Sequence, residues 1–225
     1  MKLSIIIPAH NEAELIEKTV CRIVGKVNIQ DYEIIICNDH STDNTLEIAN
    51  SIARRFGNIR VLSNDGPKGF GNVIRFGFNN AIGDYVVLMM ADLCDDPDTV
   101  NSMVPMMDKG YDVVVGSRYI RGGKKINIQN HFKSFCSWGI GFIGWHILRI
   151  KTHDSTNAFK MIRRDIIKKI NVTSNNFDIS LELTVKLYRA GAKMTEVPTI
   201  WIDRSEGSSK FNMVVASKRY IRWLK

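Results

Sequence analysis

Compact polar residues follow three apolar runs of this sequence, and they are the side chains best suited to chemistry. The three polar segments are "PAHNE" after "LSIII" (3–7), "NDHSTD" after "EIIIC" (33–37) and "ADLCDD" after "YVVLMM" (85–90). Carboxylates gathered in one crevice can hold Mg²⁺ or Mn²⁺, which take oxygen ligands and are usually shared with substrate phosphates. Asp95 and Asp96 can equally be caps of a helix that starts near Pro97. Asp92 is less easily explained in that way, so it is the stronger metal candidate.

Two further segments combine cations with small residues, as a phosphate site requires. The segment "GPKGFGNVIRFG" places Lys68 and exposed backbone amides just before a predicted helix. Its glycines do not form GxGxxG, since position 74 is Ile, and no GxxxxGK[ST] is present, which argues against a nicotinamide or P-loop site. The segment 203–210, "DRSEGSSK", joins Arg204 and Lys210 and can close over a diphosphate, although alone it also fits a solvated surface turn.

The apolar runs predict the strands that position these residues. They do not alternate with polar residues, which is typical of strands covered on both faces in a parallel sheet, and a fourth run, "DVVVG", lies at 112–116. Helical patterns at 11–24 and 41–56 separate the first runs. Strand and helix in alternation predict an α/β doubly wound sheet, whose ligands bind beyond the carboxyl ends of the strands.

The pattern is less regular after about residue 120. The expected elements are a glycine-rich basic loop at 121–130, a strand at 156–162, a helix at 178–191, an edge strand at 193–202, and a basic amphipathic helix over the last fifteen residues. No internal repeat or linker interrupts them.

Composition limits the classes of protein. The chain has 225 residues, 44% of them hydrophobic, which suffices for one core, and we expect a single domain over 1–225. Its 31 Lys and Arg against 23 Asp and Glu give a net charge of +8, which favours an anionic partner. The 4 cysteines form no CxxC pair, so no zinc site or disulfide framework is indicated and a cytosolic location fits best. The longest uncharged stretch, 134–148, is too short for a transmembrane helix, and "LSIIIP" is too short for a signal peptide.

Seven segments together resemble, in order and spacing, the dolichyl-phosphate mannose synthase group of inverting family-two glycosyltransferases. They span roughly 3–211 and read "SIIIPAHNEAELI", "IIICNDHSTDNT", "KGFGNVIRFGF", "MMADLCDDP", "VVVGSRYIRGG", "DSTNAFKMIRRD" and "IDRSEGSSK". Single motifs of this kind are weak, whereas seven in order are highly specific. The resemblance implies a GT-A fold, with a mainly parallel sheet flanked by helices. It also implies transfer of a hexose from a nucleotide sugar, GDP-mannose or a UDP-hexose, to a polyprenyl phosphate with Mg²⁺ or Mn²⁺ as cofactor.

The resemblance implies a role for individual residues as well. Those that match the donor-binding positions of the family are Pro8, Ala9, His10, Glu12, Asp39, Lys68, Ala91 and Cys94. Those that match catalytic positions are Asp92, Arg118, Arg204 and Lys210. Asp92 corresponds to the second acid of the Asp-x-Asp element and would bind the metal. Arg118 would face the substrate phosphates, and Arg204 and Lys210 belong to a closing loop at about 203–210.

Two departures from the family pattern affect the metal and the nucleoside. Met90 stands in place of the first acid of Asp-x-Asp, and a thioether is not a hard anionic ligand. Asp92 must then hold the cation with the donor diphosphate, waters and Asp95 or Asp96, so we expect weaker metal affinity. Asn38 stands in place of the first acid of an Asp-Asp pair. These departures leave open a nucleotide-sugar-binding protein without catalysis.

A basic and aromatic segment at about 120–155 suits an acceptor that lies in a bilayer. Trp138, Phe142 and Trp145 are accompanied by a set of cations, namely Lys124, Lys125, Lys133, Arg149 and Lys151. This combination predicts peripheral contact with the cytoplasmic face of a membrane, although the aromatic rings can instead fill the core. A soluble or polysaccharide acceptor is the alternative substrate. Nucleic acid is not expected, because it explains the positive charge but none of the acidic strand ends.

Overall fold

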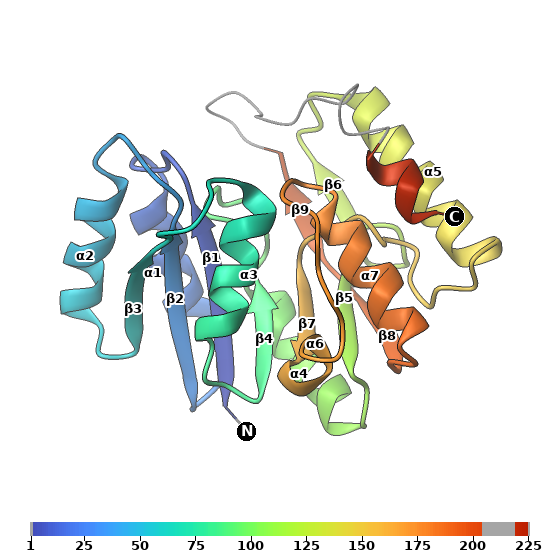
Figure 1. The fold of residues 1–225 in the computed structure, drawn as a ribbon, viewed down its shortest axis with the longest axis horizontal. Coiled ribbons are helices and arrows are strands. Elements are labelled where there is room, and N and C mark those ends of the chain that lie inside the picture. The colour runs from blue at the N-terminus through green and yellow to red at the C-terminus, as the bar shows by residue number, and fades with distance from the viewer. Residues whose placement is uncertain (1, 204–218, 225) are drawn as a thin grey trace.

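The computed structural model describes residues 2–203 and 219–224, and a seven-stranded sheet forms its centre (Figure 1). The strands are β1 (Leu3–Ala9), β2 (Tyr32–Asn38), β3 (Ile59–Ser63), β4 (Tyr85–Leu88), β5 (Val113–Ser117), β6 (Lys124–Ile126), β7 (Lys160–Arg163), β8 (Met194–Pro198) and β9 (Ile200–Ile202). The helices are α1 (Ile16–Lys26), α2 (Thr45–Arg55), α3 (Phe70–Asn80), α4 (Asp98–Asp108), α5 (His131–His146), α6 (Arg164–Ile167) and α7 (Ile179–Arg189). The strand order is β3-β2-β1-β4-β7-β5-β8, and β6 pairs with β9 in a separate small sheet.

The central sheet is mainly parallel and buried on both faces. Strands β3, β2, β1 and β4 run parallel, as do β5 and β8, whereas β7 is antiparallel to both of its neighbours. One face packs against α1, α2 and α4, and the other against α3 and α7. Every residue of β1 is buried, which is why its sequence shows no alternation. The predicted α/β architecture is therefore confirmed.

Several expected boundaries differ from the observed ones. The segment 121–130 is not wholly a loop, because it contains β6. The expected strand at 193–202 is two strands, since the chain leaves the central sheet at Thr199, whose amide donates to the Ser117 carbonyl and whose carbonyl accepts from Lys124. The edge strand β3 was not predicted. Its Arg60 and Leu62 are only half-buried, so the run lacks a continuous apolar pattern.

The helices lie close to their predicted positions. The pattern at 178–191 corresponds to α7, which ends before Gly191, a residue in the left-handed conformation with φ of 82°. The segment 132–150 forms most of α5, and no helix within residues 2–203 and 219–224 is long and apolar enough to cross a membrane. Of the helix expected over the last fifteen residues, 219–223 is helical, and 211–218 lies outside the described residues.

Candidate active site

The structure brings the three polar strand ends together, as predicted. Strands β2, β1 and β4 are adjacent and parallel, so the residues that follow them emerge at the same edge of the sheet. The Asp39 amide donates to the Ala9 carbonyl at 2.8 Å, and His10 Nδ1 lies 2.7 Å from the Asp39 carbonyl oxygen. The chain after Pro8 is thereby joined to the chain after β2. This juxtaposition forms the first wall of the candidate site.

The Asp39 carboxylate holds the loop that carries Lys68. Asn64 Nδ2 donates to Asp39 Oδ1 and the Gly69 amide donates to Asp39 Oδ2, each at 3.0 Å. Gly69 has a φ of 145°, and a Cβ at this position would lie 2.6 Å from the backbone oxygen of Asn175. Only glycine fits this turn into α3. Lys68, itself exposed, is therefore fixed next to the β1 and β2 ends.

Glu12 belongs to the same wall through its backbone. Its amide donates to Thr45 Oγ1 at 2.8 Å, which joins the chain just before α1 to the start of α2. Asp43 accepts from the Thr45 amide at 3.0 Å. The polar residues after β2 thus hold the chain that follows β1.

The acidic segment after β4 forms the second wall. Asp92 is 8% exposed, and its Oδ1 accepts from the Cys94 amide at 3.1 Å. The Ala91 carbonyl accepts from Thr19 Oγ1 at 2.8 Å, and the Cys94 carbonyl accepts from the Ile202 amide at 3.0 Å. Strand β9 and α1 therefore position the residues on both sides of Asp92.

The interpretation of Asp95 and Asp96 as helix caps is wrong, because α4 begins after Pro97 without a side-chain cap. Asp95 Oδ2 instead accepts from the Met90 amide at 3.0 Å. Met90, which stands in place of the first acid of Asp-x-Asp, therefore orients the Asp95 carboxylate through its backbone. Burial, followed by the charge of Asp92, raises the pKa of Asp95 to about 7. Asp96 turns the other way and lies 3.6 Å from Arg22 and Lys26.

The donor atoms of this wall fit a hard cation only in part. No group of three His, Cys, Asp or Glu side chains that could hold a metal occurs among the described residues. Met90 adds no anionic oxygen, and Cys94 is 2% exposed. Mg²⁺ is commonly bound by one or two carboxylates together with substrate phosphates. Among the described residues, Asp92 therefore fits a cation that shares its coordination with a bound phosphate.

Arg118 forms the third wall, at the end of β5. Its Nε and Nη2 each donate to the Asp154 carboxylate at 2.7 Å, and Nη2 lies 3.4 Å from Ser137 Oγ on α5. Burial opposes the charge of Arg118, but Asp154 outweighs it and raises the pKa of the guanidinium. The charge of Arg118 also lowers the pKa of Asp95, so the second and third walls lie close together.

Asp154 is the site residue that the sequence did not single out. It is fully buried, and it is the acid in the otherwise nearly uncharged run "DSTNAF". A buried acid of this kind requires a cation as its partner. This requirement was the feature of the sequence by which Asp154 could have been found. Arg204 and Lys210, the predicted closing cations, lie outside the described residues.

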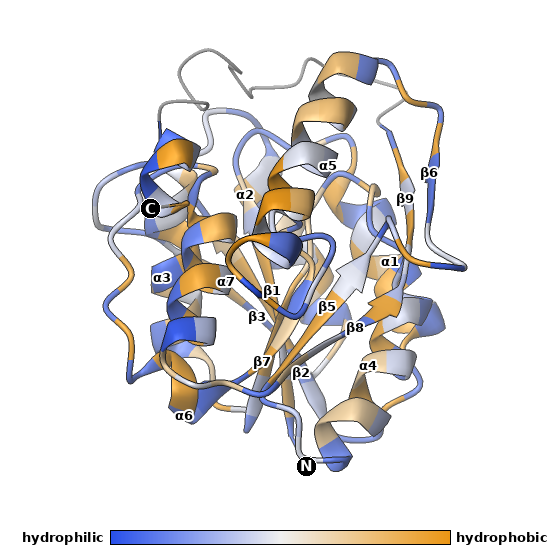
Figure 2. Cartoon of the chain, turned by 90° about the vertical axis from the view of Figure 1, so that its right-hand side faces the viewer, coloured by the Kyte–Doolittle hydropathy of each residue, from blue (hydrophilic) through white to orange (hydrophobic). Residues whose placement is uncertain are grey.

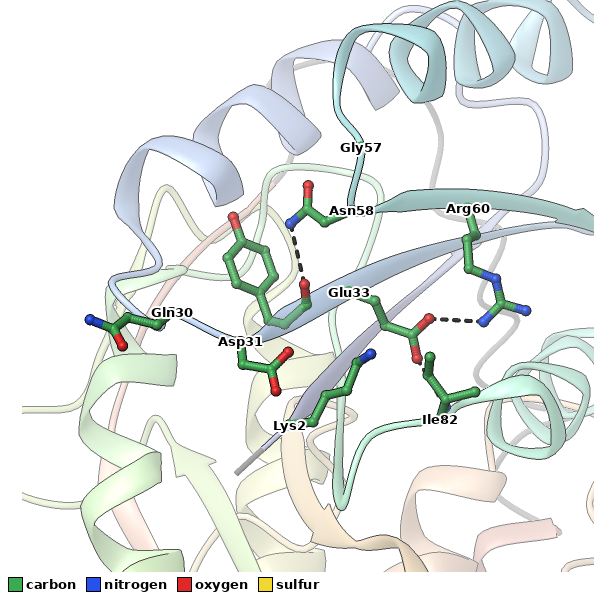
Figure 3. Close-up of a pocket in the computed structure, with 9 residues that line it drawn as sticks. Lys2, Gln30, Asp31, Glu33, Gly57, Asn58, Arg60 and Ile82 are labelled. Carbon is green, nitrogen blue, oxygen red and sulfur yellow. Dashed lines mark hydrogen bonds and ion pairs between the residues drawn. The ribbon is translucent and has the colours of Figure 1, made fainter.

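A separate polar pocket lies at the opposite edge of the sheet (Figure 3). Its lining comes from the amino ends of strands, among them Lys2, Glu33 and Arg60. Arg60 Nη1 donates to Glu33 Oε2 at 2.8 Å, and Ser4 Oγ donates to Glu33 Oε1 at 2.6 Å. This network satisfies a buried carboxylate between β1, β2 and β3. Ligands of open α/β sheets bind at the other edge, so we assign the pocket no part in the candidate site.

The fold and the three walls define an α/β protein of the GT-A class. Residues 4–171 match the model of the glycosyl transferase family 2, which is most of the chain. The chain therefore belongs to the glycosyl transferase family 2.

Relatives and solved structures agree with this assignment. The dolichol-phosphate mannosyltransferase of Pyrococcus furiosus is 31% identical over 93% of this chain and 59% of its own length. The undecaprenyl-phosphate mannosyltransferase of Micrococcus luteus is 26% identical over 99% of this chain and 94% of its own length. Glucosyl-3-phosphoglycerate synthase of Mycobacterium tuberculosis, crystallised with Mn²⁺ and UDP, superposes with a TM-score of 0.76 at 18% identity, covering 99% of this chain and 78% of that one. The predicted GT-A fold is confirmed. The chain spans less than two thirds of the Pyrococcus relative.

Proposed function

We propose that the chain transfers a hexose, with inversion, from a nucleotide sugar to a polyprenyl phosphate at a membrane surface. The observation that carries the proposal is that the acidic segment with Asp92, which follows β4, and the segment with Arg118, which follows β5, leave the sheet at the same edge. The names of the Pyrococcus and Micrococcus relatives support a polyprenyl phosphate acceptor and make mannose the first sugar to test. The proposal treats 1–225 as one glycosyltransferase domain.

The donor side would hold the nucleoside between the ends of β1 and β2. Asp39 is buried and organises the loop, with lone pairs left on its carboxylate for N–H or O–H groups of a base or ribose. Pro8, Ala9, His10 and Glu12 would line this pocket, and Lys68 would approach the diphosphate as a point charge. Ala91 and Cys94 would lie against the sugar and diphosphate. Guanine and uracil both present N–H donors, so GDP-mannose and UDP-hexoses are the donors to compare.

Asp92 would hold Mg²⁺ or Mn²⁺ together with the donor diphosphate. When bound, such a cation supplies positive charge that stabilises the leaving nucleoside diphosphate. The Cys94 amide donates to Asp92 Oδ1 and so fixes the orientation of the carboxylate. The Mn²⁺ in the Mycobacterium structure supports the choice of a divalent cation.

The acceptor side needs no general base. A phosphate monoester has a second pKa of about 6, so its oxygen is already anionic near neutral pH. Arg118 would orient that phosphate, and Asp154 keeps the guanidinium in one geometry through two hydrogen bonds of 2.7 Å. Arg204 and Lys210 would close over the diphosphate. Catalysis would then depend on positioning and on neutralisation of charge.

Helix α5 is largely hydrophobic along its length (Figure 2), and it would bring the site to the membrane. Phe135, Trp138 and Phe142 are 64%, 46% and 48% exposed, so these aromatic residues do not fill the core. Adjacent rings along the helix lie 5.9 and 5.7 Å apart and form one apolar stripe. Trp145 differs, because it stacks on His153 at 3.9 Å. An exposed aromatic stripe in a chain with an excess of cations favours an anionic bilayer surface, at the cytoplasmic face.

The transfer is tested by measuring nucleoside diphosphate release from a panel of GDP- and UDP-sugars with and without a short polyprenyl phosphate. We expect release that requires the lipid phosphate and falls at least about 100-fold in Asp92→Asn, the loss typical of a missing electrostatic contact. Release that proceeds equally with water-soluble sugar acceptors would favour a soluble or polysaccharide acceptor. No release with any donor, combined with measurable nucleotide binding, would instead support a binding protein without catalysis.

The membrane contact is tested by sedimentation with vesicles that contain anionic lipid. We expect the variant with Phe135, Trp138 and Phe142 all replaced by Ser to lose vesicle binding. Ile82→Ser is the matched control, because Ile82 is 52% exposed but lies beside the pocket at the opposite edge of the sheet. Equal binding of both variants and the wild type would contradict the assignment of α5.

A further inference from the structure

Lys160 is a buried cation that core packing does not explain. It is the first residue of β7 and is 1% exposed. Its Nζ has no hydrogen-bond partner, a condition it shares among the described residues with Asp96 Oδ1 and Ser155 Oγ. Taking an ammonium group out of water costs several kcal/mol unless it is paired. Groups buried at such expense are commonly functional.

Lys160 lies close to the third wall of the candidate site, the one that Arg118 forms. Strand β7 is antiparallel to β5, and Lys160 pairs with Val115, so it lies at the edge of the sheet where β5 ends and Arg118 follows. Asp154, six residues earlier, is the fully buried partner of Arg118. The fields of Asp154 and Arg118 both reach the Lys160 ammonium. Lys160, Asp154 and Arg118 therefore form one electrostatic group.

The charge of this group depends on Lys160. Arg118 and Asp154 form a bidentate pair, and such a pair alone has no net charge to attract a phosphate dianion. A protonated Lys160 gives the three residues a net charge of +1. In the poorly screened interior this charge acts at a distance, without a direct contact.

We propose that Lys160 is a positioning residue for the acceptor phosphate, whose buried ammonium balances Asp154 and leaves the charge of Arg118 available to the substrate. The inference rests on the proposed function, because it takes Arg118 as the phosphate-binding residue. It adds a residue that does not touch the substrate and acts through Asp154.

The charge of Lys160 changes near neutral pH. Burial is the largest influence and, with a smaller effect of Arg118, overcomes the attraction of Asp154, which lowers the pKa to about 7. Other ionisable groups surround this face of the sheet and are the same in every variant below. On α7 and the loop before it these are Glu182, paired with Lys186, and Asp178, which accepts from Ser174. The remaining ones are Tyr220 of the helical residues 219–223, Tyr119, His153, which pairs with Glu196 of β8, and Asp95, which lies within the field of Arg118.

The test compares Lys160→Met, which keeps the chain length without the charge, with Lys160→Arg, which keeps the charge at every pH. Binding of a short polyprenyl phosphate is measured by calorimetry, and KM and kcat by nucleoside diphosphate release, at about pH 6 and about pH 8.5. At the lower pH we expect Lys160→Met to weaken acceptor binding about tenfold, with GDP or UDP binding unchanged. At the higher pH the wild type should approach Lys160→Met, whereas Lys160→Arg should still bind about tenfold more tightly than Lys160→Met, because the titration of Asp95 is common to all three proteins.

Equal acceptor binding by Lys160→Met and the wild type at the lower pH would overturn the inference. A loss of nucleotide binding of the same size, without rescue in Lys160→Arg, would also overturn it, because that result indicates a structural role. The proposed function fails separately, if the wild type binds the lipid phosphate in a Lys160-dependent manner but releases no nucleoside diphosphate. A wild type that binds no lipid phosphate would overturn both.

Discussion

Replacing Lys160 with Met should stabilise the protein, by an amount that depends on pH. The folded state lowers the pKa of Lys160 from 10.5 to about 7. Between these values the unfolded chain binds the proton and the folded chain does not, so the stability of the wild type rises with pH across this window. At about 1.4 kcal/mol per pKa unit, the destabilisation is at most roughly 5 kcal/mol near pH 6 and roughly 2 kcal/mol near pH 9. A folded domain is typically stabilised by roughly 5–15 kcal/mol, so the destabilisation by Lys160 is a large share of the total.

The assay is urea unfolding of the wild type and Lys160→Met, followed by circular dichroism at both pH values. The free energy of unfolding should differ more near pH 6 than near pH 9, by roughly 2 to 3 kcal/mol. Arg163→Met is the control, because Arg163 ends the same strand in a half-exposed ion pair with Asp112 at 3.1 Å. Its effect should stay within about 1 kcal/mol and should not change between the two pH values. A difference for Lys160→Met that is the same at both pH values would refute the assignment of a lowered pKa.

Two further predictions concern the donor side. Met90→Asp should raise the affinity for Mn²⁺ in the absence of nucleotide at least about tenfold, because a second carboxylate would join Asp92. Titration followed by electron paramagnetic resonance measures this affinity, and an unchanged affinity would show that position 90 does not face the metal. Gly69→Ala should weaken nucleotide binding at least about tenfold in calorimetry, because its Cβ would lie 2.6 Å from the Asn175 oxygen and displace the loop held by Asp39. Gly57→Ala is the control, because Gly57 lines the pocket at the opposite edge of the sheet and has nothing within 4 Å of its Cβ; an equal effect of both substitutions would contradict this prediction.

The sequence was most informative where burial dictates residue type. Strands β1, β2, β4 and β5 are buried on both faces, so their continuous apolar runs could be recognised and their polar ends assigned to one edge. The half-buried strand β3 could not be recognised in this way. Neither could β6 and β9, which are three residues each and depend on pairing with each other. Such pairing is a long-range property that local patterns do not contain.

The candidate site shows the same division. Individual residues such as Asp39 and Asp92 could be named from their strand ends, because their positions follow from sheet topology. Their partners could not, because the Asp39 contacts with Asn64 and Gly69 and the Arg118 contacts with Asp154 join segments 25 to 36 residues apart. The burial of Lys160 could not be predicted from the sequence either, for a different reason. A lysine at the start of a strand is usually solvated, and only the three-dimensional structure shows its burial.

Under the proposed function, the order of strands also accounts for the separation of donor and acceptor. Strand β7 lies between β4, which leads to Asp92, and β5, which leads to Arg118. Neighbouring strands are about 4.8 Å apart, so β4 and β5 are separated by about 10 Å. A metal-bound diphosphate and an acceptor phosphate on opposite sides of one hexose need a separation of this order for direct displacement. Because β7 runs antiparallel, it also begins at this edge and brings Asp154 and Lys160 beneath the acceptor side. Under the proposed function, one inserted strand would thus set the spacing of the substrates, and the chain entering it would supply the buried charges near Arg118.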